Sequence, residues 1–237
     1  MKLTIIETGQ APLAIRSQFP DYPAMFSAMF EGADPSIRCE TVSLVTGAAL
    51  PAPASLEAVL YTGSPAGVYE DHAWITPLMD FIRAAADART PQIGICFGHQ
   101  AMAEALGGKV QKSEKGWGVG RHTYDLLSVP GWNGEKPATL SIAVSHQDQV
   151  VIRPPGAETI ARSEFTEFAA LHYPEIRGLS FQCHPEFDAE FAAALYGARR
   201  GTSLPAETAD AAIASLKEGC DRRFLADWIA SFLKSAR

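Results

Sequence analysis

One cysteine of the sequence stands in a setting that could support nucleophilic chemistry. Cys96 follows a short apolar run and lies between Gly94 and Gly98, where a strand-like pattern changes to a helical one. Small residues on both sides are typical of the sharp strand-to-helix turn that exposes a nucleophile. The N-terminus of the following helix would favour a thiolate and offer free N–H groups to an oxyanion. A lone cysteine is usually structural, but this setting favours a nucleophile.

A histidine near the end of another apolar run is the best candidate for the base that such a nucleophile requires. His184 stands in the segment His184-Pro185-Glu186. Pro185 disfavours a helical conformation for His184, so we expect an extended chain in which residues 184 and 186 point to the same side. Glu186 could then orient the imidazole as the third member of a triad. Without Cys96, a solvated turn would be the better interpretation.

These residues belong to a set of motifs that resembles a known family, the class I (triad-type) glutamine amidotransferases. The sequence is most similar to members that resemble the glutaminase domain of GMP synthase. The resemblance spans about residues 60–187 and rests on four motifs: Thr62–Val68, Gly94–Gln100, Ser145–Val150 and Gln182–Glu186. It implies that Cys96 attacks the side-chain amide of glutamine, that His184 transfers the proton and that Glu186 orients His184. Glutamate and ammonia would form through a γ-glutamyl thioester.

The resemblance also implies which residues hold the oxyanion and the substrate. The N–H of Phe97 and one N–H from the loop around Gly63 and Ser64 would bind the oxyanion. Gln100 would help to hold the substrate. The α-amino and α-carboxylate groups of the substrate would contact the stretch Ser145, His146, Gln147 and Asp148. Many relatives have glycine at position 64 and phenylalanine at position 183, where this chain has Ser64 and Cys183. We interpret Cys183 as core packing.

Other histidines and one tryptophan need separate interpretations. We expect His99 to be structural, His146 to shape the substrate loop, and His172 to lie in a loop without a catalytic role. Trp117, which stands between glycines, could line a pocket or serve only in packing.

Three functions remain open on these residues. The first is a glutaminase that supplies ammonia to a separate synthase; the resemblance implies that such enzymes are often weak until the partner docks. The second is a γ-glutamyl peptidase acting on another γ-glutamyl compound. The third is a non-catalytic regulatory module on the same fold, against which the intact triad argues. The segment Gly107–Val110 lacks the spacing of a Walker-type ATP loop, and only about 50 residues follow the triad. We therefore expect a stand-alone member.

Composition narrows the class of protein further. The chain has 237 residues, of which 47% are hydrophobic and 20% charged, as is ordinary for globular proteins. A net charge of −7 argues against nucleic-acid binding. No apolar run is long enough for a membrane span, and Glu7 interrupts any signal-peptide core. The four cysteines form no CxxC pair, which argues against structural zinc and favours a reducing cytoplasm. We expect a small-molecule substrate and no cofactor; the oligomeric state stays open.

Alternating short apolar and longer amphipathic runs predict an α/β fold. We expect a doubly wound, mainly parallel sheet with helices on both faces, which the resemblance makes flavodoxin-like. Strands are predicted at Leu3–Ile6, Ile37–Val45, Ala58–Tyr61 and Gln92–Cys96, and helices at Tyr22–Phe30, Trp74–Ala88 and about 97–106. Closely spaced strands beyond residue 109 predict a small antiparallel region. Helices at about 206–218 and 221–234 would form a C-terminal extension (about 205–237) of a single domain over residues 1–237. We expect the apolar stripe of the last helix to be buried within its own chain.

Overall fold

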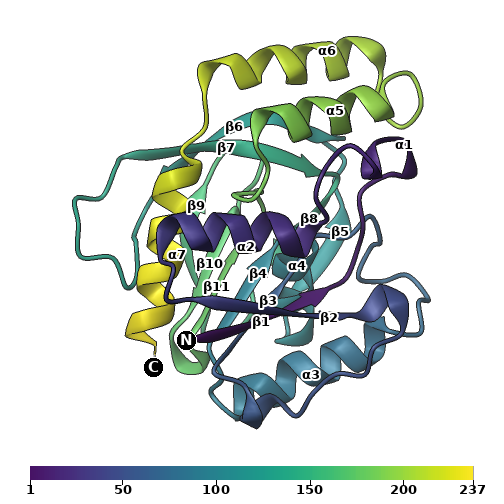
Figure 1. Ribbon diagram of the computed structural model, residues 1–237. Helices are drawn as coiled ribbons and strands as arrows, with labels where there is room; N and C mark the ends of the chain where they lie inside the picture. The colour runs from purple at the N-terminus through teal and green to yellow at the C-terminus, as the bar shows by residue number, and fades with distance from the viewer. Residues whose placement is uncertain (237) are drawn as a thin grey trace.

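The computed structural model describes residues 1–236, in which a central sheet lies between helices (Figure 1). This sheet has nine strands in the order β2-β1-β3-β4-β11-β10-β9-β6-β7. The first five run parallel: β2 (Arg38–Ser43), β1 (Lys2–Glu7), β3 (Ala58–Tyr61), β4 (Gln92–Ile95) and β11 (Gly178–Phe181). The other four are antiparallel: β10 (Ala170–Tyr173), β9 (Glu158–Arg162), β6 (Gly118–Leu126) and β7 (Thr139–His146).

The α/β fold predicted from the sequence is therefore confirmed, and the predicted antiparallel region is present. Most of its strands continue the main sheet. A separate two-stranded ribbon pairs β5 (Lys109–Lys112) with β8 (Asp148–Ile152). β11 pairs with β4 on one side and with β10 on the other. The parallel half of the sheet therefore has no free edge at β11.

Helices cover both faces of the parallel half because its strands alternate their apolar side chains. Ile5 lies in one hydrophobic cluster with Phe26 of α2 (Tyr22–Ala33) and Trp228 of α7 (Arg222–Ser235). The next residue, Ile6, faces the opposite cluster with Leu78 of α3 (Ile75–Asp87), which also includes side chains of α4 (Phe97–Ala105). Successive residues of a strand point to opposite faces, and this alternation fixes the two helical layers.

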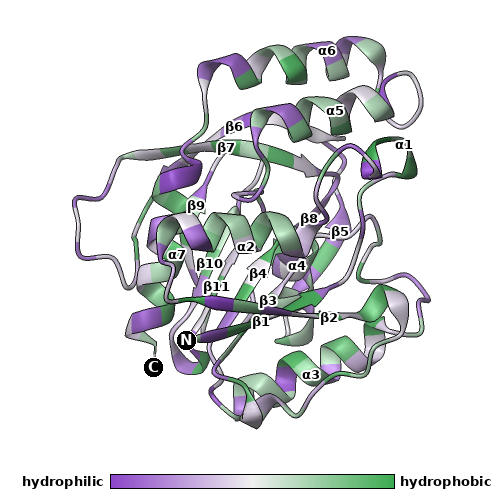
Figure 2. Cartoon of the chain, viewed as in Figure 1, coloured by the Kyte–Doolittle hydropathy of each residue, from purple (hydrophilic) through white to green (hydrophobic). Residues whose placement is uncertain are grey.

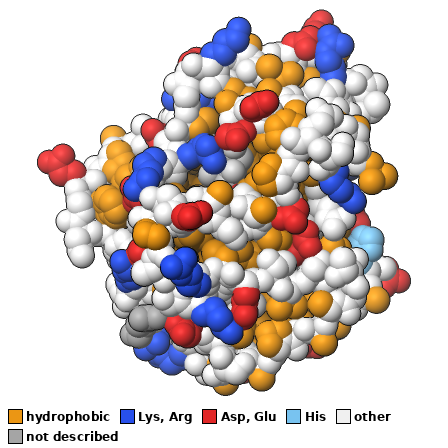
Figure 3. All heavy atoms as spheres, in the orientation of Figure 1, with side chains coloured by type: hydrophobic (Ala, Val, Ile, Leu, Met, Phe, Trp, Pro, Cys, Tyr) orange, Lys and Arg blue, Asp and Glu red, His pale blue; other side chains and the backbone are white. Residues whose placement is uncertain are grey.

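The last helix, α7, is buried within its own chain, as its apolar stripe predicts. Five residues of this stripe are at most 4% exposed: Leu225, Trp228, Ile229, Phe232 and Leu233. Each such side chain contributes about 1.5–3 kcal/mol when fully buried. Figure 2 shows hydrophobic and hydrophilic residues alternating along α7 and α3, as amphipathic helices require. Figure 3 shows acidic and basic side chains interspersed on the visible face. Within residues 1–236, no helix is both long and apolar enough to cross a membrane.

The chain between the triad and residue 206 differs from the sequence-based prediction. It forms an additional helix, α5 (Ala189–Arg199), which packs with α6 (Ala206–Ser215) beside β6 and with the short α1 (Leu13–Arg16). Asp188 caps α5 by accepting a hydrogen bond from the N–H of Phe191 at 2.7 Å. An aspartate in the N-cap position is a helix-start signal that the sequence already contained.

Candidate active site

Cys96 lies on a strained turn between β4 and α4. Its backbone has φ 54° and ψ −103°, a conformation that residues with a side chain rarely adopt. The N–H of Cys96 donates to the carbonyl oxygen of Phe181 at 2.8 Å, which ties the turn to the neighbouring strand. A Cβ atom at Gly94 would lie 2.6 Å from the carbonyl oxygen of Gly98, and one at Gly98 would lie 2.3 Å from that of Tyr61. The close packing of this turn therefore requires both glycines, as the sequence indicates.

His184 and Glu186 meet as predicted, but the backbone between them differs from the expectation. Nδ1 of His184 and Oε1 of Glu186 are 2.8 Å apart, and both side chains are buried. The segment is a turn rather than an extended chain: β11 ends at Phe181, and the N–H of Phe187 donates to the carbonyl oxygen of His184 at 3.4 Å. The ring of Phe187 also stacks on the imidazole, with centroids 3.9 Å apart. The turn and this stacking together orient the imidazole.

The imidazole of His184 and the thiol of Cys96 converge beside the loop that contains Gly63. A Cβ atom at Gly63 would lie 3.0 Å from Cε1 of His184 and 3.6 Å from Cβ of Cys96. Burial lowers the pKa of His184, but the charges and hydrogen bonds of Glu186 and Cys96 outweigh it and raise this pKa to about 10. The site therefore favours an imidazolium at neutral pH, which is the form that stabilises a neighbouring thiolate.

A residue of the C-terminal helix holds the backbone of the triad segment. Arg222 of α7 donates from Nε to the carbonyl oxygen of Pro185 at 3.0 Å and from Nη2 to that of Glu186 at 3.1 Å. The sequence analysis did not identify Arg222, because nothing in the local pattern around it points to residues 36 positions earlier.

The predicted substrate loop is fixed through one carbonyl oxygen, that of Asp148. It accepts a hydrogen bond from Nε2 of Gln100 at 2.9 Å and lies 3.1 Å from Nδ1 of His146. Gln100 Nε2 also donates to Gln182 Oε1 at 3.1 Å. Gln100 lines the cavity described below, and its contact with a substrate stays a prediction. Burial lowers the pKa of His146 to about 3. The role of His146 in shaping a substrate loop stays a prediction. Ser145 and Gln147, the other two residues of this stretch, also line the cavity described below.

The loop predicted to complete an oxyanion hole lies next to the nucleophile position. Phe97 is the first residue of α4, where backbone N–H groups have no partner within the helix. Ser64 accepts a hydrogen bond on Oγ from the N–H of Ala66 at 3.2 Å, which shapes the loop after Gly63. This placement is compatible with the predicted donors, whose role stays a prediction.

The remaining candidates lie away from the sulfur of Cys96 or serve the core. Cys183 is 1% exposed in the main hydrophobic cluster, and burial raises the pKa of its thiol well above the ordinary value. Nδ1 of His99 lies 2.7 Å from Oγ of Ser180, and burial lowers the pKa of this histidine to about 3. His172 lies on β10 rather than in a loop and pairs with Glu158 at 2.9 Å. Within residues 1–236, no three His, Cys, Asp or Glu side chains could together hold a metal ion.

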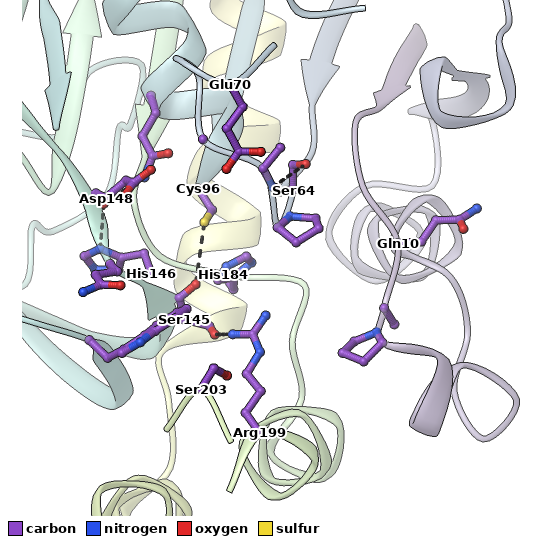
Figure 4. Close-up of a pocket in the computed structure, with 18 of the residues that line it drawn as sticks. Gln10, Ser64, Glu70, Cys96, Ser145, His146, Asp148, His184, Arg199 and Ser203 are labelled. Carbon is purple, nitrogen blue, oxygen red and sulfur yellow. Dashed lines mark hydrogen bonds between the residues drawn. The ribbon is translucent and has the colours of Figure 1, made fainter. Parts of the chain in front are cut away.

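A cavity of about 580 Å³ opens at Cys96 and His184. Figure 4 shows Cys96 near its centre, with Glu70 and Asp148 on one side and Arg199 on the other. Burial raises the pKa of the Asp148 carboxyl, against the effect of its hydrogen bond with Tyr69. The sequence analysis missed several residues of the wall: Gln10, Arg16, Tyr22, Tyr69, Glu70 and Arg199. Trp117, left open between wall and packing, lines the cavity.

Known proteins share both the sequence and the fold of this chain. Residues 45–194 match the family described as glutamine amidotransferase class-I. A glutamine amidotransferase-like protein of Schizosaccharomyces pombe is 33% identical over 76% of this chain and 73% of its own length. γ-Glutamyl peptidase 4 of Arabidopsis thaliana is 34% identical over 56% of this chain and 54% of its own. GMP synthase of Thermomicrobium roseum is 33% identical over 65% of this chain, but only 28% of its own length is matched.

The fold of this chain is also similar to that of solved structures. A glutamine amidotransferase from Thermotoga maritima superposes with a TM-score of 0.76 at 18% identity, covering 100% of this chain and 97% of that one. This likeness shows a shared fold, and the family match over residues 45–194 includes all four motifs of the sequence analysis. On these grounds the chain belongs to the class-I glutamine amidotransferase family.

Proposed function

We propose that this protein hydrolyses the γ-amide bond of glutamine or of a related γ-glutamyl compound through a covalent thioester. The observation that carries the proposal is the arrangement of Cys96, His184 and Glu186. A strained turn presents the thiol to a cavity, and an imidazole held by a buried carboxylate lies beside it. Nucleophile, base and orienting acid are the three parts of this class of chemistry.

The proposed reaction has two steps. The sulfur of Cys96 attacks the γ-carbonyl carbon, the C–N bond breaks, and the proton of His184 goes to the departing nitrogen. Water then attacks the γ-glutamyl thioester while His184 takes its proton, so that glutamate leaves and the thiolate returns. The N–H of Phe97 and one from the loop of residues 63–67 would stabilise the oxyanion in both steps. Glu186 keeps the imidazole in the orientation that both proton transfers need.

The substrate's α-amino group would bind on the acidic side of the cavity. Asp148 and Glu70 line that side, and Gln100 and His146 fix the backbone of Asp148. A carboxylate held in a fixed position is suited to an ammonium group. This arrangement supports recognition of the glutamyl end, which glutamine and other γ-glutamyl compounds share.

A γ-glutamyl peptidase is the second candidate. Its support is the Arabidopsis relative with that name, together with a cavity that continues past Cys96 to Arg199 and Trp117. A partner synthase remains part of the first candidate, since relatives include GMP synthases. A non-catalytic module is disfavoured because the chain has a cysteine, a histidine and a glutamate at the three triad positions, and a hydrogen bond joins His184 and Glu186.

The experiment is a panel of γ-glutamyl substrates incubated with the purified protein, with ammonia, amine and glutamate measured as products. We expect turnover of at least one substrate, and its loss in Cys96→Ala. A protein that cleaves no member of the panel, or a Cys96→Ala variant as active as wild type, would contradict the proposal.

A further inference from the structure

Charged residues line the cavity on both sides of Cys96. Asp148 and Glu70 lie on one side of Cys96 (Figure 4). Lys112 also lines the cavity, and its positive charge acts on the carboxylate of Asp148. This side therefore offers both negative and positive groups, which is what the α-amino and α-carboxylate groups of a γ-glutamyl compound require. A further cation, Arg199, lies on the other side and is not needed for that recognition.

Arg199 is the last residue of α5, and its side chain reaches the cavity next to the nucleophile position. Its Nη1 donates to Oγ of Ser145 at 2.6 Å, and its guanidinium lies over the ring of Trp117, 5.4 Å from the centroid. The carbonyl oxygen of Ser145 is in turn 4.0 Å from Sγ of Cys96. A single residue, Ser145, therefore connects the sulfur with the guanidinium.

The charge of Arg199 is half-buried and has no anionic partner. Among residues 1–236, no carboxylate forms an ion pair with it. Its sequence neighbour Arg200 differs: it is exposed and donates two hydrogen bonds of 2.8 Å to Asp210. A guanidinium has five N–H donors in a planar fork that matches a carboxylate. Placing it in a cavity without a counter-ion is unfavourable unless a ligand supplies one.

We propose that Arg199, with Ser145 and Trp117, forms a subsite for a carboxylate carried by the leaving amine of the substrate. The inference rests on the proposed hydrolysis of γ-glutamyl amides and narrows their class to γ-glutamyl amino acids. In these compounds the carboxylate is two bonds beyond the scissile nitrogen, on the side away from the glutamyl group. Glutamine lacks it, because its leaving group is ammonia.

The chemistry is the same as for glutamine. Sulfur attacks the γ-carbonyl carbon, the C–N bond breaks, and the proton of His184 goes to the nitrogen of the departing amino acid. Arg199 would hold the carboxylate of that amino acid while the bond breaks, and water then releases glutamate from the thioester. The residue therefore determines specificity and takes no part in proton transfer.

A matched pair of substrates tests the subsite. γ-Glutamylglycine and γ-glutamylglycinamide have nearly the same size and differ by a carboxylate against a carboxamide. For the wild-type protein we expect kcat/KM to favour γ-glutamylglycine by on the order of ten- to a hundredfold, the usual effect of hydrogen bonds to a charged group. Arg199→Gln should bring this ratio close to one, and Arg199→Lys should keep part of it. The control Arg200→Gln should keep the wild-type ratio.

The outcomes separate the subsite from the proposed function. A ratio near one in the wild type would overturn the subsite while any turnover leaves the proposed function standing. An Arg199→Gln variant that loses both substrates equally would also overturn it, because the guanidinium would then serve the α-carboxylate or the fold. Melting curves of the variants show whether they are folded. If the wild type cleaves neither compound nor glutamine, the proposed function fails and the subsite falls with it.

Discussion

The guanidinium of Arg222 donates a hydrogen bond of 3.1 Å to the carbonyl oxygen of Glu186, 36 positions earlier in the chain. A second donor of the same guanidinium binds the carbonyl oxygen of Pro185 at 3.0 Å. The backbone of the proposed third triad member is therefore held by α7, a helix that is otherwise anchored in the core by its apolar stripe. Packing of this helix and orientation of the triad are consequently linked.

Replacing Arg222 should weaken catalysis more than folding. In Arg222→Ala both carbonyl oxygens lose a charged donor, so we expect kcat to fall about tenfold, which corresponds to ~1.4 kcal/mol. The control is Arg223→Ala, which removes only an exposed ion pair with Asp227, worth about 0.3–0.5 kcal/mol of stability. Turnover and melting temperature should be measured for both variants. Equal turnover in the two would show that Arg222 does not position the triad.

Replacing Glu186 by glutamine should keep the fold and reduce turnover. The imidazole of His184 would lose the partner that orients it. A comparable change in a serine triad costs about 10⁴ in turnover, but a thiolate forms more readily than an alkoxide. We therefore expect a loss on the order of 10–10³, smaller than in Cys96→Ser or His184→Ala. Steady-state kinetics of the three variants give this order, and wild-type activity in Glu186→Gln would remove Glu186 from the triad.

The pH profile of the same variant should shift in a defined direction. The charge of Glu186 helps to raise the pKa of His184 to about 10, so the imidazolium persists at neutral pH and is lost as the pH rises through that value. Removing the negative charge lowers this pKa. The alkaline limb of kcat/KM, which reports groups of the free enzyme, should therefore move to lower pH in Glu186→Gln. A limb that stays in place, or moves upward, would contradict the assignment of His184 as the titrating group.

The strained turn at Cys96 makes its glycines sensitive to substitution. In Gly98→Ala the new Cβ would lie 2.3 Å from the carbonyl oxygen of Tyr61, so the turn must move; we expect a loss of about 1–3 kcal/mol in stability, and of most activity. Gly197→Ala in α5 is the matched control, since its Cβ would meet no atom within 4 Å. That change should be neutral or stabilise by roughly 0.5–1 kcal/mol. Denaturant unfolding measures both, and equal stabilities would contradict the close packing described here.

Much of the site could be predicted from the sequence because its determinants are local. The glycines around Cys96 and the spacing of His184 and Glu186 are readable in a few consecutive residues, and the structure brings the three side chains together. The extended conformation predicted for the backbone between His184 and Glu186 was wrong, because an extended chain and a turn both allow residues two apart to meet. The parallel half of the sheet was predictable for the same reason, as each short apolar run forms one strand.

The missed residues depend on contacts between distant parts of the chain. Arg199 reaches the cavity only because α5 packs beside β6, and the alanine-rich sequence of that helix has a weak apolar pattern. Two helices, α5 and α6, separate Arg222 along the chain from the residues that it contacts. The continuation of the main sheet through β10 and β9 likewise depends on pairing that short antiparallel strands do not reveal individually.

The purified protein should act without an added partner. The apolar stripe of α7 is buried in its own chain rather than left for a second protein, and the triad residues already converge in this chain alone. We expect hydrolysis of at least one γ-glutamyl amide by the protein alone, measured as amine or ammonia release. Absence of turnover, combined with strong activation by a co-purifying synthase, would instead favour an ammonia-supplying subunit.

Labelling of the cysteines by a diazo-ketone analogue of glutamine tests the central claim most directly. Burial raises the thiol pKa of Cys39, Cys183 and Cys220, which lowers their thiolate fractions, whereas Cys96 lines the cavity beside His184. Peptide mapping by mass spectrometry should find the label on Cys96, far faster than on the other three, and His184→Ala should slow the reaction. Label found on Cys183 instead, with Cys96 unmodified, would contradict the assignment of the nucleophile.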